Sequence, residues 1–181
     1  NNFVIHNNLG KALFDQGQNE EAMTHFREAL RINPKDARVH NNLGVLLARE
    51  GKDEEAIYHF TEALQSDPAN VEVHNSLGVL LARQGRKDEA TAHYREAVRL
   101  DPGYADAHFN LASLLDQQGK SEEAILHYTK VLQIRPAHAE GRNNLGVLLA
   151  KGGKIDESIT HLNEAVRIKP DYAEAHTNLG I

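Results

Sequence analysis

The chain has 181 residues and carries 20 basic against 26 acidic side chains, a formal net charge of -6, which argues against a nucleic-acid-binding protein with its usual basic surface. Five Tyr, five Phe and no Trp argue against base-stacking platforms. The absence of cysteine excludes disulfides, cysteine zinc sites and thiol catalysis. No apolar run approaches the roughly 18 residues of a membrane span. The sequence opens without Met and stops within a repeat, so we expect it to be part of a longer protein.

A period of 34 residues runs through the sequence. The phrase NNLGVLLA fills residues 41–48 and returns three periods later at 143–150, and residues 75–82 read NSLGVLLA. A fixed period of this length indicates a repeat architecture. Three columns mark it: Leu9, Leu43, Leu77, Leu111, Leu145 and Leu179; Gly17, Gly51, Gly85, Gly119 and Gly153; and Pro34, Pro68, Pro102, Pro136 and Pro170.

Each period predicts two helices. Leu43 and Leu47 lie at i and i+4 on one helix face, and Ala56 and Phe60 have the same spacing on a second. Gly51 between them can end the first helix with a positive φ, and the prolines cannot continue the second. The pattern therefore predicts antiparallel helices of about 12–14 residues joined by a short turn.

Two further local features follow from helix chemistry. Asn19, Asp53 and Ser121 are expected as N-caps of the second helices. Gly44 is expected where the two helices of a repeat cross closely. Glycine inside a helix costs about 1 kcal/mol relative to Ala, so its recurrence in this column indicates close packing.

These columns resemble the tetratricopeptide repeat. The match covers residues 3–181, with complete repeats at 3–36, 37–70, 71–104, 105–138 and 139–172 and a partial repeat at 173–181. The resemblance implies an all-α solenoid of antiparallel helix pairs, a right-handed superhelix in one array over residues 1–181, whose concave face is lined by the first helices. Where the family often has Trp, we expect looser packing against the preceding repeat, because this chain has His6, His40, His74, His108, Arg142 and His176.

Asparagine is concentrated in the first helix of nearly every repeat, although it is unfavourable in a helix interior. An amide pointing into the groove offers one acceptor and two donors, and can hold an extended peptide, about three residues per repeat, with little regard for its sequence. Alternatively, one Asn column binds the neighbouring repeat. The predicted peptide-binding residues are Asn7, Asn8, Asn41, Asn42, Asn75, Asn110, Asn144 and Arg38.

Family resemblance suggests two more specific functions. Chaperone-binding tetratricopeptide domains hold a terminal carboxylate with clustered Lys and Arg, but beside the Asn pairs only Lys11 and Arg38 are basic here. The Asn-rich groove is similar to that of the O-linked N-acetylglucosamine transferase family, and bacterial membrane glycosyltransferases also carry such repeats. That resemblance implies a substrate-recruiting arm whose catalytic part lies outside this chain.

The 11 histidines invite a metal hypothesis, because ten of them fall in two columns. Equivalent residues of neighbouring repeats lie about 10 Å apart, too far to share a zinc ion, and no HxxxH or HExxH pair occurs. We interpret them as packing residues at repeat interfaces. The columns are His6, His40, His74, His108 and His176, and His25, His59, His93, His127 and His161.

The sequence therefore predicts a protein–protein interaction scaffold that binds a protein segment or extended peptide. Nucleophile-elbow, phosphate-loop and dinucleotide motifs are missing, so we expect no catalytic residue, cofactor or metal, and no nucleic-acid partner. The recruiting arm of a glycosyltransferase and a self-assembly module are the alternatives. Because the first and last helices lack a neighbour on one side, we also expect end-to-end association.

Overall fold

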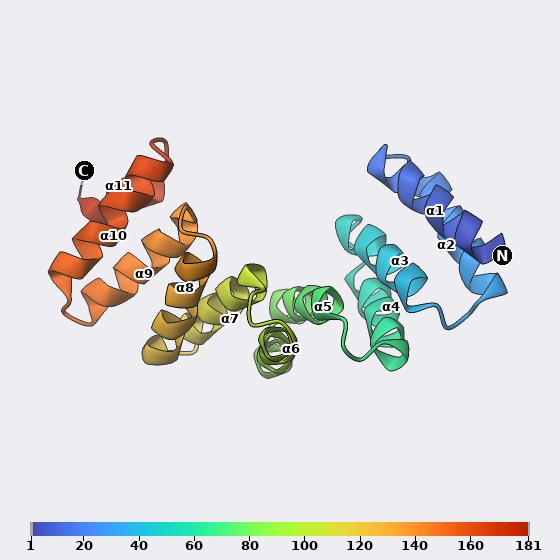
Figure 1. Ribbon diagram of the computed structural model, residues 1–181, viewed down its shortest axis with the longest axis horizontal. Helices are drawn as coiled ribbons and strands as arrows, with labels where there is room; N and C mark the ends of the chain where they lie inside the picture. The colour runs from blue at the N-terminus through green and yellow to red at the C-terminus, as the bar shows by residue number, and fades with distance from the viewer. Residues whose placement is uncertain (1, 181) are drawn as a thin grey trace. The chain divides into compact units, whose positions relative to one another are not determined.

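The computed structural model describes residues 2–180, and all regular secondary structure among them is α-helical (Figure 1). None of the helices in this range is both long and apolar enough to cross a membrane. The predicted all-α solenoid of antiparallel helix pairs is confirmed. The helices are α1 (Asn2–Asp15), α2 (Asn19–Ile32), α3 (Ala37–Arg49), α4 (Asp53–Ser66), α5 (Val71–Arg83), α6 (Lys87–Leu100), α7 (Ala105–Gln117), α8 (Ser121–Ile134), α9 (Ala139–Lys151), α10 (Ile155–Ile168) and α11 (Ala173–Leu179).

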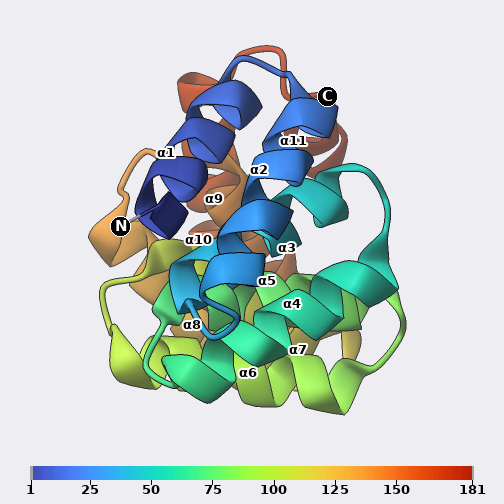
Figure 2. The ribbon, with the colours of Figure 1, turned by 90° about the vertical axis from the view of Figure 1, so that its right-hand side faces the viewer.

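The helices form two compact units, the first ending at Leu100 and the second beginning at Asp101. In the first unit, α1 packs on α2, α3 on α4 and α5 on α6, and each second helix also packs on the first helix that follows it. Figure 2 shows α1 and α2 side by side. In the second unit, α7 packs on α8 and α9 on α10, with α11 against α10. A single array over the whole chain remains a prediction.

A glycine with positive φ closes the turn inside each helix pair. Gly51 has φ +73°, as the sequence predicted, and the next residue, Lys52, donates its backbone N–H to the Leu47 carbonyl over 2.9 Å. This bond satisfies a carbonyl that the end of α3 leaves without a helical partner. A positive φ of 76–79° recurs at Gly17, Gly85, Gly119 and Gly153.

The predicted N-caps of the second helices are wrong by one residue. Asn19, Asp53 and Ser121 are the first residues inside α2, α4 and α8. The turn places a single residue between the positive-φ glycine and the helix, and that residue takes the cap position. No side-chain cap bond forms there, and the cap residues are Gln18, Lys52 and Lys120.

Close helix contact, predicted at Gly44, is confirmed, and its partner is an aromatic ring. A Cβ on Gly44 would lie 2.8 Å from Cε1 of Phe60, a side chain that is 1% exposed. The ring therefore packs directly on the α3 backbone, and the dispersion contacts it gains offset the poor helix propensity of glycine. The same arrangement joins Gly10 to the Phe26 ring and Gly78 to the Tyr94 ring, and at Gly146 the Leu162 side chain takes the place of the ring.

Candidate functional site

Asparagine side chains connect neighbouring first helices. Asn42 Nδ2 donates to Asn7 Oδ1 over 2.9 Å, and Asn7 is only 8% exposed. In the second unit, Asn178 Nδ2 donates to the Oδ1 of the buried Asn143 over 2.8 Å. Both bonds span 35 residues, so each joins one repeat to the next. For these two pairs the structure shows the alternative interpretation, in which amides bind the adjacent repeat.

The Asn42 amide should contribute measurably to stability. Replacing Asn42 with alanine removes the donor to the buried Asn7 carbonyl, and we expect the free energy of unfolding to fall by about 0.5–1.5 kcal/mol. Asn8 is exposed on the same helix as Asn7, so Asn8→Ala should change it by less than about 0.5 kcal/mol. Urea denaturation measures both, and equal losses would contradict a structural role for the pair.

Asn144 uses a different partner because Phe109 occupies the position where the preceding repeat would supply an Asn acceptor. Asn144 Nδ2 lies 3.1 Å from the Tyr128 hydroxyl and donates to it. Burial raises the pKa of Tyr128, so the hydroxyl stays protonated at neutral pH. This amide is therefore also engaged within the fold.

The remaining predicted residues lie at separate places. Asn41 and Asn110 are half-buried on α3 and α7. Arg38 is at the start of α3, where its guanidinium forms an ion pair with Asp36 at 3.1 Å. Asn75, on α5, lines a cavity.

That cavity, of about 450 Å³, lies on α3, α4 and α5. It combines an apolar surface, the amide and hydroxyl of two neighbouring α5 residues, and two guanidinium groups. An apolar pocket with a few polar groups is the usual form of a binding site. The lining residues are Val45, Ala48, Arg49, Phe60, Asn75, Ser76, Val79, Leu80 and Arg83.

The sequence interpretation missed Arg49 and Arg83. They occupy equivalent positions in the last turns of α3 and α5. The positions predicted to face the groove are those beside the Asn pairs, and the basic residues at these positions are Lys11 and Arg38. One turn further along, the column contains Arg49, Arg83 and Lys151. A basic residue there is common for a simpler reason, the negative end of the helix dipole, so the column alone did not indicate a site.

The two cavity arginines have different partners. Arg83 donates to both carboxylate oxygens of Asp53, so its charge is compensated. The guanidinium carbon of Arg49 lies 4.4 Å from the centre of the Phe14 ring, in a cation–π contact. No carboxylate within residues 2–180 forms an ion pair with Arg49. One uncompensated positive charge therefore borders the cavity.

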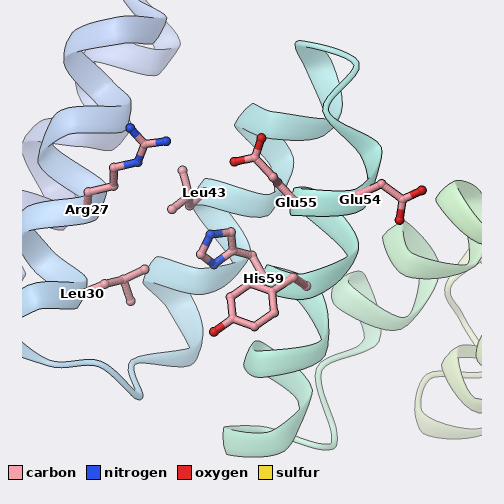
Figure 3. Close-up of a pocket in the computed structure, with 7 residues that line it drawn as sticks. Arg27, Leu30, Leu43, Glu54, Glu55 and His59 are labelled. Atoms are coloured by element: carbon pink, nitrogen blue, oxygen red, sulfur yellow. The ribbon is translucent and has the colours of Figure 1, made fainter.

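A second cavity, of about 580 Å³, lies between α2 and α4 (Figure 3). Arg27 on α2 and Glu55 on α4 place opposite charges around it, while Leu30 and Leu43 supply apolar surface. Glu54 also lines it, so the cavity has two carboxylates and one guanidinium group. We place the candidate site at the cavity on α3–α5, because Asn75 of the predicted set lines that cavity.

His59, which also lines the second cavity, belongs to a histidine pair. His40 Nδ1 lies 2.9 Å from His59 Nδ1, and His40 Nε2 lies 2.9 Å from the Pro34 carbonyl oxygen. Because a carbonyl only accepts, His40 carries its proton on Nε2 and accepts at Nδ1 from His59. Equivalent Nδ1 contacts of 2.8–3.0 Å join His6 to His25, His74 to His93 and His108 to His127.

These contacts change the interpretation of the histidine columns. His40 is 4% exposed and binds the carbonyl that closes the preceding repeat, so the expected looser packing is not observed there. Burial, with the nearby charges of His40 and Arg27, lowers the pKa of His59 to about 4. Burial also lowers the pKa of His93 and that of His108, which keeps them neutral at pH 7. No group of three potential metal ligands occurs within residues 2–180.

Sequence comparison identifies the repeat. A family profile described as TPR repeat matches residues 10–51 and 148–181. Two profiles described as Tetratricopeptide repeat match residues 37–70 and, in overlapping segments, 59–105 and 75–139. No curated protein sequence matches the chain.

Solved structures share the fold. YrrB, described as a TPR protein with an unusual peptide-binding site, matches with a TM-score of 0.83 and 23% identity, over 97% of this chain and 91% of its own. MamA gives 0.83 and 22%, over 96% and 94% of the two chains. PilF of Pseudomonas aeruginosa gives 0.85 and 25%, over 96% and 79%. None is described as a glycosyltransferase, so the more specific resemblance to those enzymes gains no support. The repeats and the shared solenoid show that the chain belongs to the tetratricopeptide-repeat family.

Proposed function

We propose that this chain is a protein-interaction module that binds an extended peptide segment along its first helices, centred on the α3–α5 cavity. One observation carries the proposal: the cavity places Val45 and Val79 beside the polar side chains of Asn75 and Ser76. A bound segment needs apolar surface for a side chain and hydrogen-bonding groups for its backbone. The shared fold with YrrB, described as having a peptide-binding site, supports the same function.

The bond between Asn7 and Asn42 leaves part of the Asn42 amide for a bound peptide. An amide has one acceptor and two donor hydrogens, and the bond between Asn7 and Asn42 uses one donor hydrogen and one acceptor. The half-buried Asn42 thus keeps its carbonyl oxygen and one N–H for a peptide backbone. We therefore keep the predicted residues of the first unit as a proposed contact surface, in which Asn7 and Asn42 are bound to each other.

A second candidate function is self-association through α1. Ile5 is 63% exposed and Leu9 43% exposed on this helix. Isolated exposed apolar residues are common, but two on one helix face favour a contact with another chain. End-to-end association therefore remains a prediction.

Selection from a phage-displayed library of random 12-residue peptides tests the main proposal. We expect binders, and we expect Val79→Lys to weaken them at least about tenfold by placing an ammonium group in the cavity. Tyr58→Lys is the matched control, because Tyr58 is 58% exposed and lines the second cavity. Circular dichroism confirms that each variant is folded.

Two outcomes would contradict the proposal. A library without binders would remove the peptide-binding function. Binders weakened by Tyr58→Lys and unaffected by Val79→Lys would move the site to the cavity between α2 and α4.

A further inference from the structure

We infer that the α3–α5 cavity selects a partner segment in which an acidic residue stands two positions from an apolar one, and that Arg49 binds the acid. This inference rests on the proposed peptide-binding function and adds the chemistry of the partner. It follows from the charged side chains around the cavity, from the hydrogen-bonding groups of Arg49 and from the apolar lining of the cavity.

The charges around the cavity leave Arg49 as the residue able to accept an anion. Arg83 is bound to Asp53 through both carboxylate oxygens. Glu50, the neighbour of Arg49 in sequence, is bound by Lys52 Nζ over 2.7 Å. A carboxylate that approaches Arg49 therefore does not have to displace an existing ion pair.

The contact with Phe14 leaves the hydrogen-bonding groups of Arg49 available. A guanidinium group is planar, and its N–H donors point outward in that plane. The carbon at its centre lies 4.4 Å from the centre of the Phe14 ring, and within residues 2–180 its N–H groups donate no hydrogen bond. These donors can bind a carboxylate with two parallel hydrogen bonds.

The apolar surface of the cavity sets the second requirement. Val45 and Val79 line the same cavity as Arg49. In an extended segment, neighbouring side chains point to opposite faces and alternate ones to the same face. A Leu-sized side chain in the cavity thus places the side chain of an acidic residue two positions away on the same face, within reach of the cavity edge. A basic segment would bring its charge to the uncompensated guanidinium group of Arg49 and is disfavoured.

Three synthetic peptides test the inference by fluorescence anisotropy: SGESLSEGS, SGQSLSQGS and SGKSLSKGS, each labelled at its N-terminus. We expect the Glu peptide to bind about tenfold more tightly than the Gln peptide, as for a charge-assisted hydrogen bond, and the Lys peptide to bind most weakly. The preference should decrease as salt is added, because the site is partly exposed.

Arg49→Gln should reduce the Glu-over-Gln preference to about one, and Arg49→Lys should retain part of it. Arg31→Gln is the matched control, since Arg31 lies on α2, does not line the cavity, and has a side chain that is 73% exposed and paired with Glu28 of the same helix. A preference that survives Arg49→Gln, or no binding of the Glu peptide, would overturn the inference. The displayed library separates the two levels: binders without an acidic residue two positions from an apolar one leave the proposed function standing, and a library without binders removes both.

Discussion

Replacing Phe60 with alanine should lower the free energy of unfolding by about 3–5 kcal/mol. The Phe60 ring is 1% exposed and packs against the α3 backbone at Gly44. Glycine has no side chain that could move into the space left by the ring, so most of the cavity should persist. Because repeats contact only their neighbours, the loss should destabilise the stack locally. Urea denaturation followed by circular dichroism measures it.

Two variants serve as controls for this prediction. Tyr58→Ala removes an aromatic ring from the same helix, but Tyr58 is 58% exposed, so its cost should stay within about 0.5 kcal/mol. Gly44→Ala should destabilise although alanine favours helix by about 1 kcal/mol, because the new Cβ would lie 2.8 Å from Phe60 Cε1. A stabilised Gly44→Ala protein would contradict the packing described.

The double variant adds a further test. Once Phe60 is alanine, the methyl group of Gly44→Ala no longer meets the ring, and the two costs should not add. A strictly additive double variant would show that the residues act independently.

Acid should destabilise the protein between pH 6.5 and 5, because the histidine pairs resist protonation. The pKa of His59 falls from an ordinary 6.5 to about 4 in the folded chain, and burial also lowers the pKa of His93, that of His108 and that of His161. The unfolded chain then binds protons that the folded chain does not. The contribution of these histidines to the free energy of unfolding is fully present above pH 6.5 and is lost as the pH falls toward the folded pKa. For one site the loss is up to about 1.4 kcal/mol per pH unit.

His59 takes part in the pair through Nδ1, which lies 2.9 Å from His40 Nδ1. His59→Gln removes one site that titrates and should reduce the slope by about one proton. Urea denaturation at pH 7.5, 6.5, 5.5 and 5.0 measures it; a flat profile, or an unchanged slope in His59→Gln, would contradict the role of the pairs.

The sequence was sufficient to predict the helix pairs and their turns. The 34-residue period fixes which residues are equivalent, and positive φ at Gly51 follows from its place between two helical patterns. The N-caps were missed because the turn inserts one residue, Lys52, before α4. That offset depends on turn geometry, which composition does not specify.

The site was less predictable because it depends on how neighbouring helices are rotated. The columns showed that Asn7 and Asn42 share a surface, but not that they bind each other. The histidine columns likewise did not reveal that Nδ1 atoms of residues 19 apart meet. Arg49 was missed since a side chain at the end of a helix reaches the cavity only at the observed crossing of α3 and α5.

The bond between histidine and the closing proline has an evolutionary consequence. His40 Nε2 donates to the Pro34 carbonyl, and His74 Nε2 lies 3.1 Å from the Pro68 carbonyl in the same way. These two junctions are therefore made from the same two groups, one from either side, whereas Arg142 takes the place of the histidine at the Pro136 carbonyl. A tandem duplication of one 34-residue segment would create a junction that already has both partners, so the gene can lengthen this protein without inventing a new interface.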